Sequence, residues 1–188
     1  VKIMRIVGGK FRGRPLETPK DQGIRPTSDR IREALFSIIG SKIDIENTRV
    51  LDLFAGTGAL GIEALSRGAA FCLFVETQGA ARALIRTNSE KFGVMGHSKI
   101  YRRDATKLGP RPTSAGPEFD IVFADPPYGC GLAEPALKDL LTGNWLSPEA
   151  LVIVEESAKS EIILPDRFEK IDERQYGESQ IIFLQTRT

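Results

Sequence analysis

The chain has 188 residues, of which 41% are hydrophobic and 27% are charged, a composition typical of one globular domain with a hydrophobic core. It has no apolar run long enough to cross a membrane and no charged-then-apolar stretch at its start, so we expect a cytoplasmic protein without a membrane partner. One histidine (His97, which we expect at the surface) and two cysteines (Cys72, which we expect to be buried, and Cys130) argue against a histidine metal site and a disulfide framework, and we expect no metal.

Charge is distributed unevenly along the chain. Residues 1–32 hold nine Lys and Arg against three acidic residues, a balance of +6, so the remainder carries −5 of the net charge of +1. A basic end on an acidic body indicates a segment that faces a polyanion, although a solvated arm without a partner is an equal alternative. Residues 3–18 alternate loosely around Gly8-Gly9 and Gly13, which predicts a small β-hairpin or an extended arm.

The sequence after this segment predicts helices and strands in the following order. A helix is expected over about residues 29–39, after Thr27 or Ser28 as its cap and before Gly40. Strands are predicted at 50–54, 71–76, 99–103, 120–124 and 150–155, and helices at 59–66, 80–92 and 132–141. Two last strands, at 168–174 and 180–185, are too close for a helical crossover and should pair antiparallel. The pattern predicts an α/β fold in which a mixed seven-stranded sheet carries helices on both faces.

A glycine-rich turn joins the first of these strands to its helix. Gly56, Gly58 and Gly61 have the spacing G-x-G-x-x-G, and Glu76 stands 20 residues past Gly56 at the end of the next strand. Such glycines let the backbone approach a nucleotide, and the distant acid accepts hydrogen bonds from ribose hydroxyls. Taken alone the motif would suggest NAD, but the carboxylate of Asp52 would repel a pyrophosphate.

Asp52 therefore favours S-adenosylmethionine, which has an ammonium, a sulfonium and a ribose but no phosphate. The alternative is that Asp52 bonds only the local backbone. We include Phe54, at the end of the strand, in the expected cofactor site. Asp104 follows the third strand and lies near the adenine amine in this interpretation, although it is equally well explained as a helix cap ahead of Ala105.

The segment Asp125-Pro126-Pro127-Tyr128 directly follows the fourth strand. Because ligands gather at the carboxyl ends of parallel strands, this segment should face the same crevice as the glycine turn. The exocyclic amine of a base is a poor nucleophile, and acceptors around its hydrogens stabilise the charge that develops during methyl transfer. The Asp125 carboxylate and the Pro126 carbonyl are two such acceptors, and Tyr128 offers a face for stacking. A Pro-Pro turn beside a surface tyrosine is the weaker alternative.

The chain resembles a known family, the RsmD-type guanine-N2 methyltransferases of bacterial small-subunit (16S) ribosomal RNA. The resemblance covers nearly the whole chain. It is carried by Gly8-Gly9-Lys10 with Gly13-Arg14, Arg25-Pro26-Thr27 to Arg32-Glu33-Ala34-Leu35-Phe36, Leu51 to Gly61, Glu63 to Ala69, and Asp125 to Tyr128. The chain departs from the family's pattern at Thr77-Gln78, where an acidic residue is common, and the local adenosine contacts are therefore open.

The resemblance implies a class I methyltransferase fold that binds S-adenosylmethionine around Asp52, Gly56, Gly58 and Glu76. It implies a target-base site at Asp125 to Tyr128. We expect a basic N-terminal arm over residues 1–27 for RNA contact and a methyltransferase domain over 28–188. The expected RNA contacts are Lys10, Arg12, Arg14, Arg25 and Pro127. The sequence leaves open whether free ribosomal RNA or an assembled small-subunit particle is the partner, and we expect a monomer.

Two other functions remain open at this stage. The same Asp-Pro-Pro-Tyr segment serves adenine-N6 methyltransferases of DNA or RNA, although the length leaves no room for an inserted target-recognition domain. The chain could also be a catalytically silent nucleotide-binding module that docks on RNA through its basic arm, against which the presence of both Asp125 and Tyr128 argues.

Overall fold

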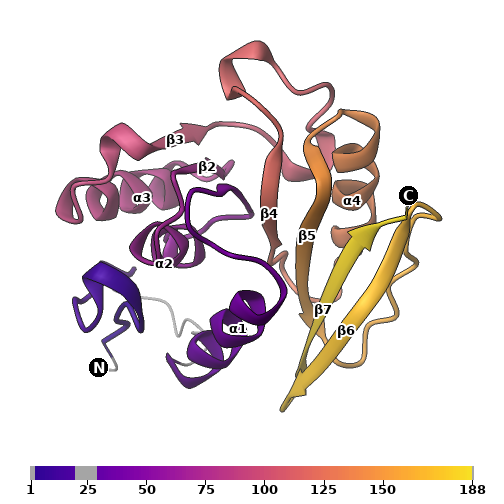
Figure 1. Cartoon of the computed structure of the whole chain (residues 1–188), viewed down its shortest axis with the longest axis horizontal. Helices are drawn as coiled ribbons and strands as arrows, with labels where there is room; N and C mark the ends of the chain where they lie inside the picture. The colour runs from indigo at the N-terminus through magenta and orange to yellow at the C-terminus, as the bar shows by residue number, and fades with distance from the viewer. Residues whose placement is uncertain (1–2, 20–28, 188) are drawn as a thin grey trace.

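The structure, a computed structural model, describes residues 3–19 and 29–187 (Figure 1). Seven strands form one sheet in the order β3-β2-β1-β4-β5-β7-β6. Their bounds are Arg49–Leu53 (β1), Phe71–Val75 (β2), Ser98–Tyr101 (β3), Phe119–Ala124 (β4), Leu146–Ser157 (β5), Phe168–Tyr176 (β6) and Ser179–Thr186 (β7). The first five are parallel, and β7 runs antiparallel to both β5 and β6. The predicted mixed seven-stranded sheet is confirmed.

Helices cover both faces of this sheet, as expected. Their bounds are Asp29–Lys42 (α1), Ala59–Ser66 (α2), Gly79–Lys91 (α3) and Ala133–Thr142 (α4), with 3-10 turns at Gly9–Phe11 (η1), Met95–His97 (η2), Ala105–Lys107 (η3) and Thr113–Ala115 (η4). Alternate strand residues point to opposite faces. One set, including Val50, Phe74 and Phe123, packs with α1, α2 and α3. The other set, including Leu51 and Val122, packs with α4.

The fifth strand is longer than the prediction, because β5 begins at Leu146 rather than near Ala150. Leu146 pairs with Phe119, and the register then shifts before Ile121 pairs with Leu151. Pro148 and Glu149 lie within this irregular stretch, and Glu149 has a φ of 62°. Proline in a strand is confined to such irregular or edge positions, which is why the stretch looked like a loop in the sequence.

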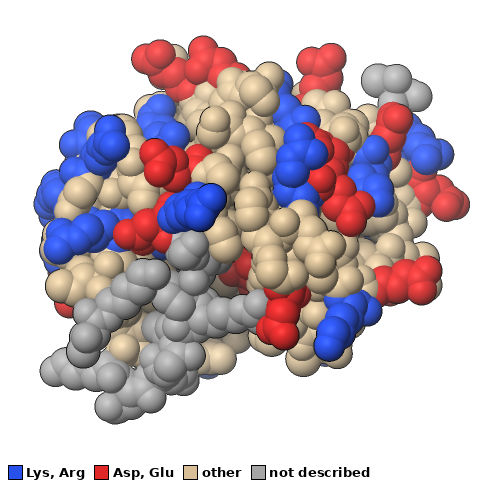
Figure 2. Space-filling view, turned by 90° about the horizontal axis from the view of Figure 1, so that it is seen from below, with Lys and Arg blue, Asp and Glu red and all other residues tan. Residues whose placement is uncertain are grey.

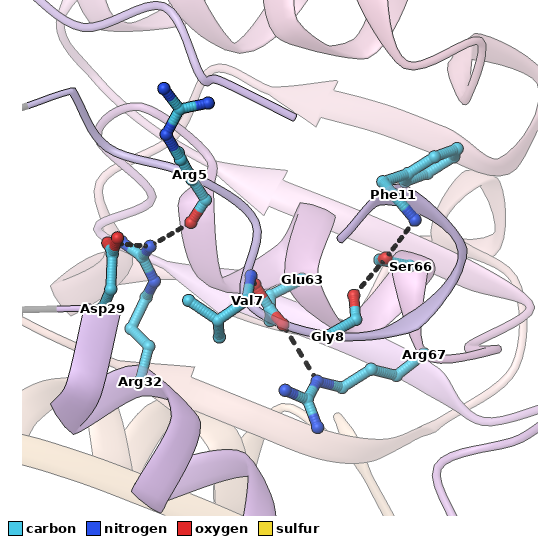
Figure 3. Close-up of polar contacts among 9 residues, drawn as sticks. All are labelled: Arg5, Val7, Gly8, Phe11, Asp29, Arg32, Glu63, Ser66 and Arg67. Atoms are coloured by element: carbon cyan, nitrogen blue, oxygen red, sulfur yellow. Dashed lines mark hydrogen bonds and ion pairs between the residues drawn. The ribbon is translucent and has the colours of Figure 1, made fainter. Parts of the chain in front are cut away.

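The predicted N-terminal β-hairpin forms no named strands, but the two arms of the segment lie antiparallel, with backbone hydrogen bonds from the Ile6 amide to the Arg14 carbonyl (3.0 Å) and from the Leu16 amide to the Met4 carbonyl (2.9 Å). Residues 3–19 contain a single isolated antiparallel bridge, between Arg5 and Pro15, and the 3-10 turn η1. Helix α2 takes up two other backbone donors of the segment (Figure 3). The amide of Val7 donates to the Glu63 carboxylate (2.9 Å), and that of Phe11 donates to the Ser66 hydroxyl (2.9 Å).

The N-terminal segment is also anchored by apolar contacts. Four of its side chains are buried in the core on the side of α2 and α3: Met4, Ile6, Phe11 and Leu16. The Arg32 guanidinium donates to the Arg5 carbonyl and to Asp29, which ties the segment to α1 (Figure 3). Residues 3–19 are therefore packed against the α/β body. Among the described residues no helix is long and apolar enough to span a membrane.

Candidate active site

The carboxyl ends of the central strands meet at one edge of the sheet. Leu53, the last residue of β1, is paired with Val75 of β2 on one side and with Ala124 of β4 on the other. Phe54, Glu76 and Asp125 each follow directly after these strand ends. The register therefore brings the predicted cofactor and base residues side by side, although they are far apart in the sequence.

The glycine turn is shaped by positive backbone angles. Phe54 has a φ of 56°, Gly56 of 56° and Gly58 of 78°. The value at Phe54 is unusual for a bulky residue, and such strain concentrates at functional sites. A Cβ on Gly61 would lie 2.4 Å from the Phe74 ring, so this glycine lets α2 pack closely on the sheet. Gly58 caps α2, while Gly56 lines a cavity.

Asp52 lies in β1 with only 2% of its surface exposed. Its carboxylate accepts a hydrogen bond from the Gly61 amide in the first turn of α2 (3.0 Å). Burial raises the pKa of Asp52 to about 8, against the lowering effect of the Gly61 bond, and the charge of Glu76 raises it further. The side chain both bonds the local backbone and lines a cavity with Gly56, so the two interpretations of Asp52 are compatible.

Glu76 joins the glycine turn to the end of β2. One carboxylate oxygen accepts from the Gly56 amide (2.9 Å), and the other accepts from the Gln78 amide (2.8 Å). These bonds fix the orientation of the carboxylate at the mouth of the site. Each carboxylate oxygen has two lone pairs, so Glu76 retains capacity for ligand hydroxyls.

Two adjoining cavities open along this edge. The first, of about 680 Å³, is lined by Asp52, the glycine turn and residues of α3. The second, of about 730 Å³, is lined by Asp104 and the whole segment from Asp125 to Tyr128. Four residues line both cavities: Phe54, Glu76, Gln78 and Asp125. The two cavities therefore form one cleft, with the residues predicted for the cofactor and those predicted for the base along its adjoining parts.

The Asp-Pro-Pro-Tyr segment places its acid at the junction of these cavities. Burial raises the pKa of Asp125 well above its ordinary value, and the charges of Glu155, Asp52 and Glu156 act in the same direction. Pro126 is buried and Pro127 is exposed. Asp125 is thus a more basic carboxylate than an exposed aspartate.

Tyr128 is held by two residues that sequence reasoning did not place in the site. Its hydroxyl donates to the Glu155 carboxylate and lies 2.9 Å from the Ser179 hydroxyl. Burial, followed by the bond to Glu155, raises the pKa of Tyr128 above its ordinary value, which keeps the phenol neutral. The next residue, Gly129, donates its amide to Glu156 (2.9 Å). The end of β5 therefore positions the whole segment.

Asp104 caps the turn η3 by accepting from both the amide (2.8 Å) and the hydroxyl (2.7 Å) of Thr106, and these bonds lower its pKa. It also lines the larger cavity. Both explanations given for Asp104 thus fit its position.

Among the charged residues that line the cleft, the sequence analysis did not place Glu17, Arg32, Arg103 or Glu155 there. A signal existed for Glu155, because a charged residue ends the otherwise apolar run Leu151-Val152-Ile153-Val154. Arg32 is 1% exposed, and its Nε and Nη1 have no hydrogen-bond partner among the described residues. Within the same residues, no cluster of three or more His, Cys, Asp or Glu side chains is placed to hold a metal.

Of the predicted RNA contacts that the structure describes, Pro127 lines the cleft, whereas Lys10, Arg12 and Arg14 do not. Lys10, Arg12 and Arg14 are exposed on the N-terminal segment, while Arg25 lies outside the described residues. Arg14 stacks over the rings of Phe92 (4.7 Å) and Phe11 (5.3 Å) and donates to the Lys91 carbonyl. Arg14 therefore has a structural role of its own.

The positive charge of this segment continues onto α3, which carries Arg82, Arg86 and Lys91. Figure 2 shows Lys and Arg side chains gathered on the left of the view, the side where Figure 1 places α3 and the N-terminal segment. Acidic and basic side chains are more evenly mixed toward the right. One side of the molecule is therefore suited to a polyanion.

Comparison with known proteins agrees with this geometry. Residues 4–185 match a family described as "Conserved hypothetical protein 95". The chain is 34% identical to a protein of Haemophilus influenzae and 38% identical to one of Escherichia coli, both named "Ribosomal RNA small subunit methyltransferase D". These matches cover 93% and 84% of this chain, and 89% and 76% of the relatives.

A solved structure extends the agreement to the fold. The structure of the Escherichia coli protein yhhF, a proposed methyltransferase, superposes with a TM-score of 0.85 at 31% identity, over 100% of this chain and 99% of that one. The class I methyltransferase fold expected from the resemblance is thereby confirmed.

Proposed function

We propose a function for this chain, which belongs to the family described as "Conserved hypothetical protein 95". It transfers a methyl group from S-adenosylmethionine to the exocyclic N2 amine of a guanine in small-subunit ribosomal RNA. The resemblance to the RsmD-type enzymes supports this, and two relatives are named as small-subunit ribosomal RNA methyltransferases. The single observation that carries the proposal is the shared cleft, in which Asp125 borders both the glycine turn and Tyr128.

The residues of the smaller cavity fit the cofactor. When bound, S-adenosylmethionine supplies a methyl group on a positively charged sulfonium. Asp52 offers a buried carboxylate to the ammonium, and Glu76 offers acceptors to the ribose hydroxyls. Gly56 allows the backbone to approach the ligand closely. Phe54 and Asp104 complete the proposed contacts, whereas Gly58 contributes by starting α2.

The target amine meets acceptors of the larger cavity. The Asp125 carboxylate and the Pro126 carbonyl accept hydrogen bonds from its two hydrogens, which favours the charge that develops on nitrogen. Tyr128 stacks on the base. The nitrogen lone pair forms the new bond to carbon while the sulfur keeps the electrons of the broken bond. The raised pKa of Asp125 suits it to accept the proton that the methylated nitrogen releases.

RNA binding belongs to the basic side of the molecule. We assign residues 1–27, with Lys10 and Arg12 as phosphate contacts, to RNA binding and residues 28–188 to catalysis. Arg25 and Pro127 remain proposed RNA contacts. Because Arg14 stacks on Phe92, its contribution is shared between folding and RNA contact. We expect the enzyme to act as a monomer in the cytoplasm, where ribosomes are assembled.

The test is methyl transfer from tritiated S-adenosylmethionine to small-subunit ribosomal RNA, followed by nucleoside analysis. We expect label in N2-methylguanosine and its loss in the Asp125→Asn variant, with adenine-rich RNA and DNA as controls. Label in N6-methyladenosine would replace guanine by adenine as the target. No transfer to any nucleic acid by a protein that binds the cofactor would favour a silent binding module.

A further inference from the structure

We propose that Glu155 reads the target guanine by accepting a hydrogen bond from its ring N1–H, and so selects guanine over purines whose N1 is an acceptor. This inference rests on the proposed function, since it concerns the base that the same site methylates. It adds a specificity-determining residue outside the Asp-Pro-Pro-Tyr segment.

Strand register places Glu155 next to the catalytic acid. Ala124 at the end of β4 pairs with Val154 of the neighbouring parallel strand β5, so Asp125 and Glu155 are the next residues of the two strands. Both line the larger cavity together with Pro126, Pro127 and Tyr128. The charge of Glu155 also acts on Asp125, whose pKa is raised first by burial and then by this neighbour.

The Glu155 carboxylate is buried and oriented. Only 8% of the residue is exposed, and a buried carboxylate is costly without donors around it. Tyr128 supplies one donor from its hydroxyl, which also lies 2.9 Å from the Ser179 hydroxyl. Because Tyr128 is the proposed stacking platform, these bonds fix the carboxylate relative to the plane of the stacked base.

Two neighbouring acceptors match the edge of guanine. Guanine presents the N2 amine and the N1–H side by side, both as donors. When the amine lies at Asp125, the adjacent N1–H requires a second acceptor, and Glu155 lies beside Asp125 in the same cavity. Adenine presents its amine beside an unprotonated N1, whose lone pair would face the Glu155 carboxylate. A site built to accept from N1–H therefore rejects adenine through an unpaired, repulsive contact.

The test uses RNA in which the methylated guanine, once identified, is replaced by 2-aminopurine. This base keeps the target amine but has a lone pair at N1. We would measure the ratio of kcat/KM on guanine RNA to that on 2-aminopurine RNA. In Glu155→Gln the amide carbonyl still accepts from Tyr128, while its NH2 group can donate to N1. We expect the ratio to fall about 10- to 100-fold, the range for one base-reading contact.

Matched controls distinguish recognition of the base by Glu155 from a role of Glu155 in positioning Tyr128. Tyr128→Phe keeps the ring and the Glu155 acceptor but removes the hydroxyl that orients it, so its ratio should fall less than that of Glu155→Gln. Glu155→Asp keeps the acceptor and should likewise retain the preference for guanine. S-adenosylhomocysteine binding and the thermal unfolding midpoint should match wild type in Glu155→Gln.

Three results are decisive. If Glu155→Gln lowers activity on both substrates equally, Glu155 only positions Tyr128 and the inference is wrong. If wild type itself does not prefer guanine RNA over 2-aminopurine or 2,6-diaminopurine RNA, the inference is wrong whether or not the variants fold. If wild type methylates no guanine at all, the proposed function fails, which is a distinguishable result.

Discussion

The buried carboxylate of Asp52 should make cofactor affinity depend on pH. Burial raises its pKa to about 8 in the ligand-free protein, so Asp52 is mostly protonated at neutral pH. An ammonium beside the carboxylate favours the charged form, and binding should therefore expel a proton. We expect S-adenosylhomocysteine, which carries the same ammonium, to bind more tightly as pH rises from about 5.5 to 7.5.

The size of this effect follows from the difference between the pH of the experiment and the pKa of Asp52. At pH 6, two units below it, ionising Asp52 costs about 2.7 kcal/mol, which corresponds to roughly 100-fold weaker binding than when the group is already charged. Calorimetry in two buffers of different ionisation enthalpy should show close to one proton released per ligand. Asp52→Asn keeps an acceptor for the Gly61 amide and should bind independently of pH. A flat profile for wild type, or an equal slope in the variant, would refute the ammonium contact.

The stability of the ligand-free protein should decrease as pH rises, whereas cofactor affinity should increase. The folded pKa of Asp52 lies above its ordinary value, so the folded state holds this proton more tightly than the unfolded state does. This contribution is complete below about pH 4 and is lost as pH rises toward 8. The difference in thermal unfolding midpoint between Asp52→Asn and wild type should therefore grow in favour of the variant across this window.

The remaining predictions concern the base, the ribose and the RNA. Asp125→Asn should lower kcat by about 100-fold or more, and Tyr128→Ala should cost about 1–3 kcal/mol of base binding, both with S-adenosylhomocysteine affinity unchanged in calorimetry. Glu76→Ala should weaken cofactor binding by about 1–3 kcal/mol and leave RNA affinity unchanged. Replacing Lys10 and Arg12 by Gln should flatten the salt dependence of RNA binding by about two units of slope, and parallel slopes would make the segment a solvated arm.

Most of the architecture was predictable because the strands are buried on both faces. Runs such as Ile121-Val122-Phe123-Ala124 are apolar at every position, and glycines or polar residues bound them. The glycine turn and the Asp-Pro-Pro-Tyr segment follow such strands, and parallel register then brings them together. Local sequence was sufficient wherever the determining contacts lie within one strand–turn–helix unit.

The sequence was insufficient where contacts between distant segments decide the structure. The anchoring of the N-terminal segment was not predictable, because Glu63 and Ser66, more than 50 residues away, accept from the amides of Val7 and Phe11. Glu155 was missed for the same reason, since its place beside Asp125 depends on how β4 and β5 pair. The structural role of Arg14 was missed for the same reason, since the Phe92 ring beneath it is distant in the sequence.

The charge of the cleft also bears on turnover. The carboxyl groups of Asp52, Glu76, Asp125 and Glu155 line it and outnumber the arginines Arg32 and Arg103. Burial, followed by the charges of neighbouring carboxylates, raises the pKa of Asp125. Such a site favours a ligand that brings positive charge. The methyl donor carries a net charge of one, from its ammonium, sulfonium and carboxylate, whereas the demethylated product is neutral. In the proposed function, methyl transfer removes the charge that these side chains attract, and we therefore expect the residues proposed to hold the donor to bind the product less tightly and to favour its release.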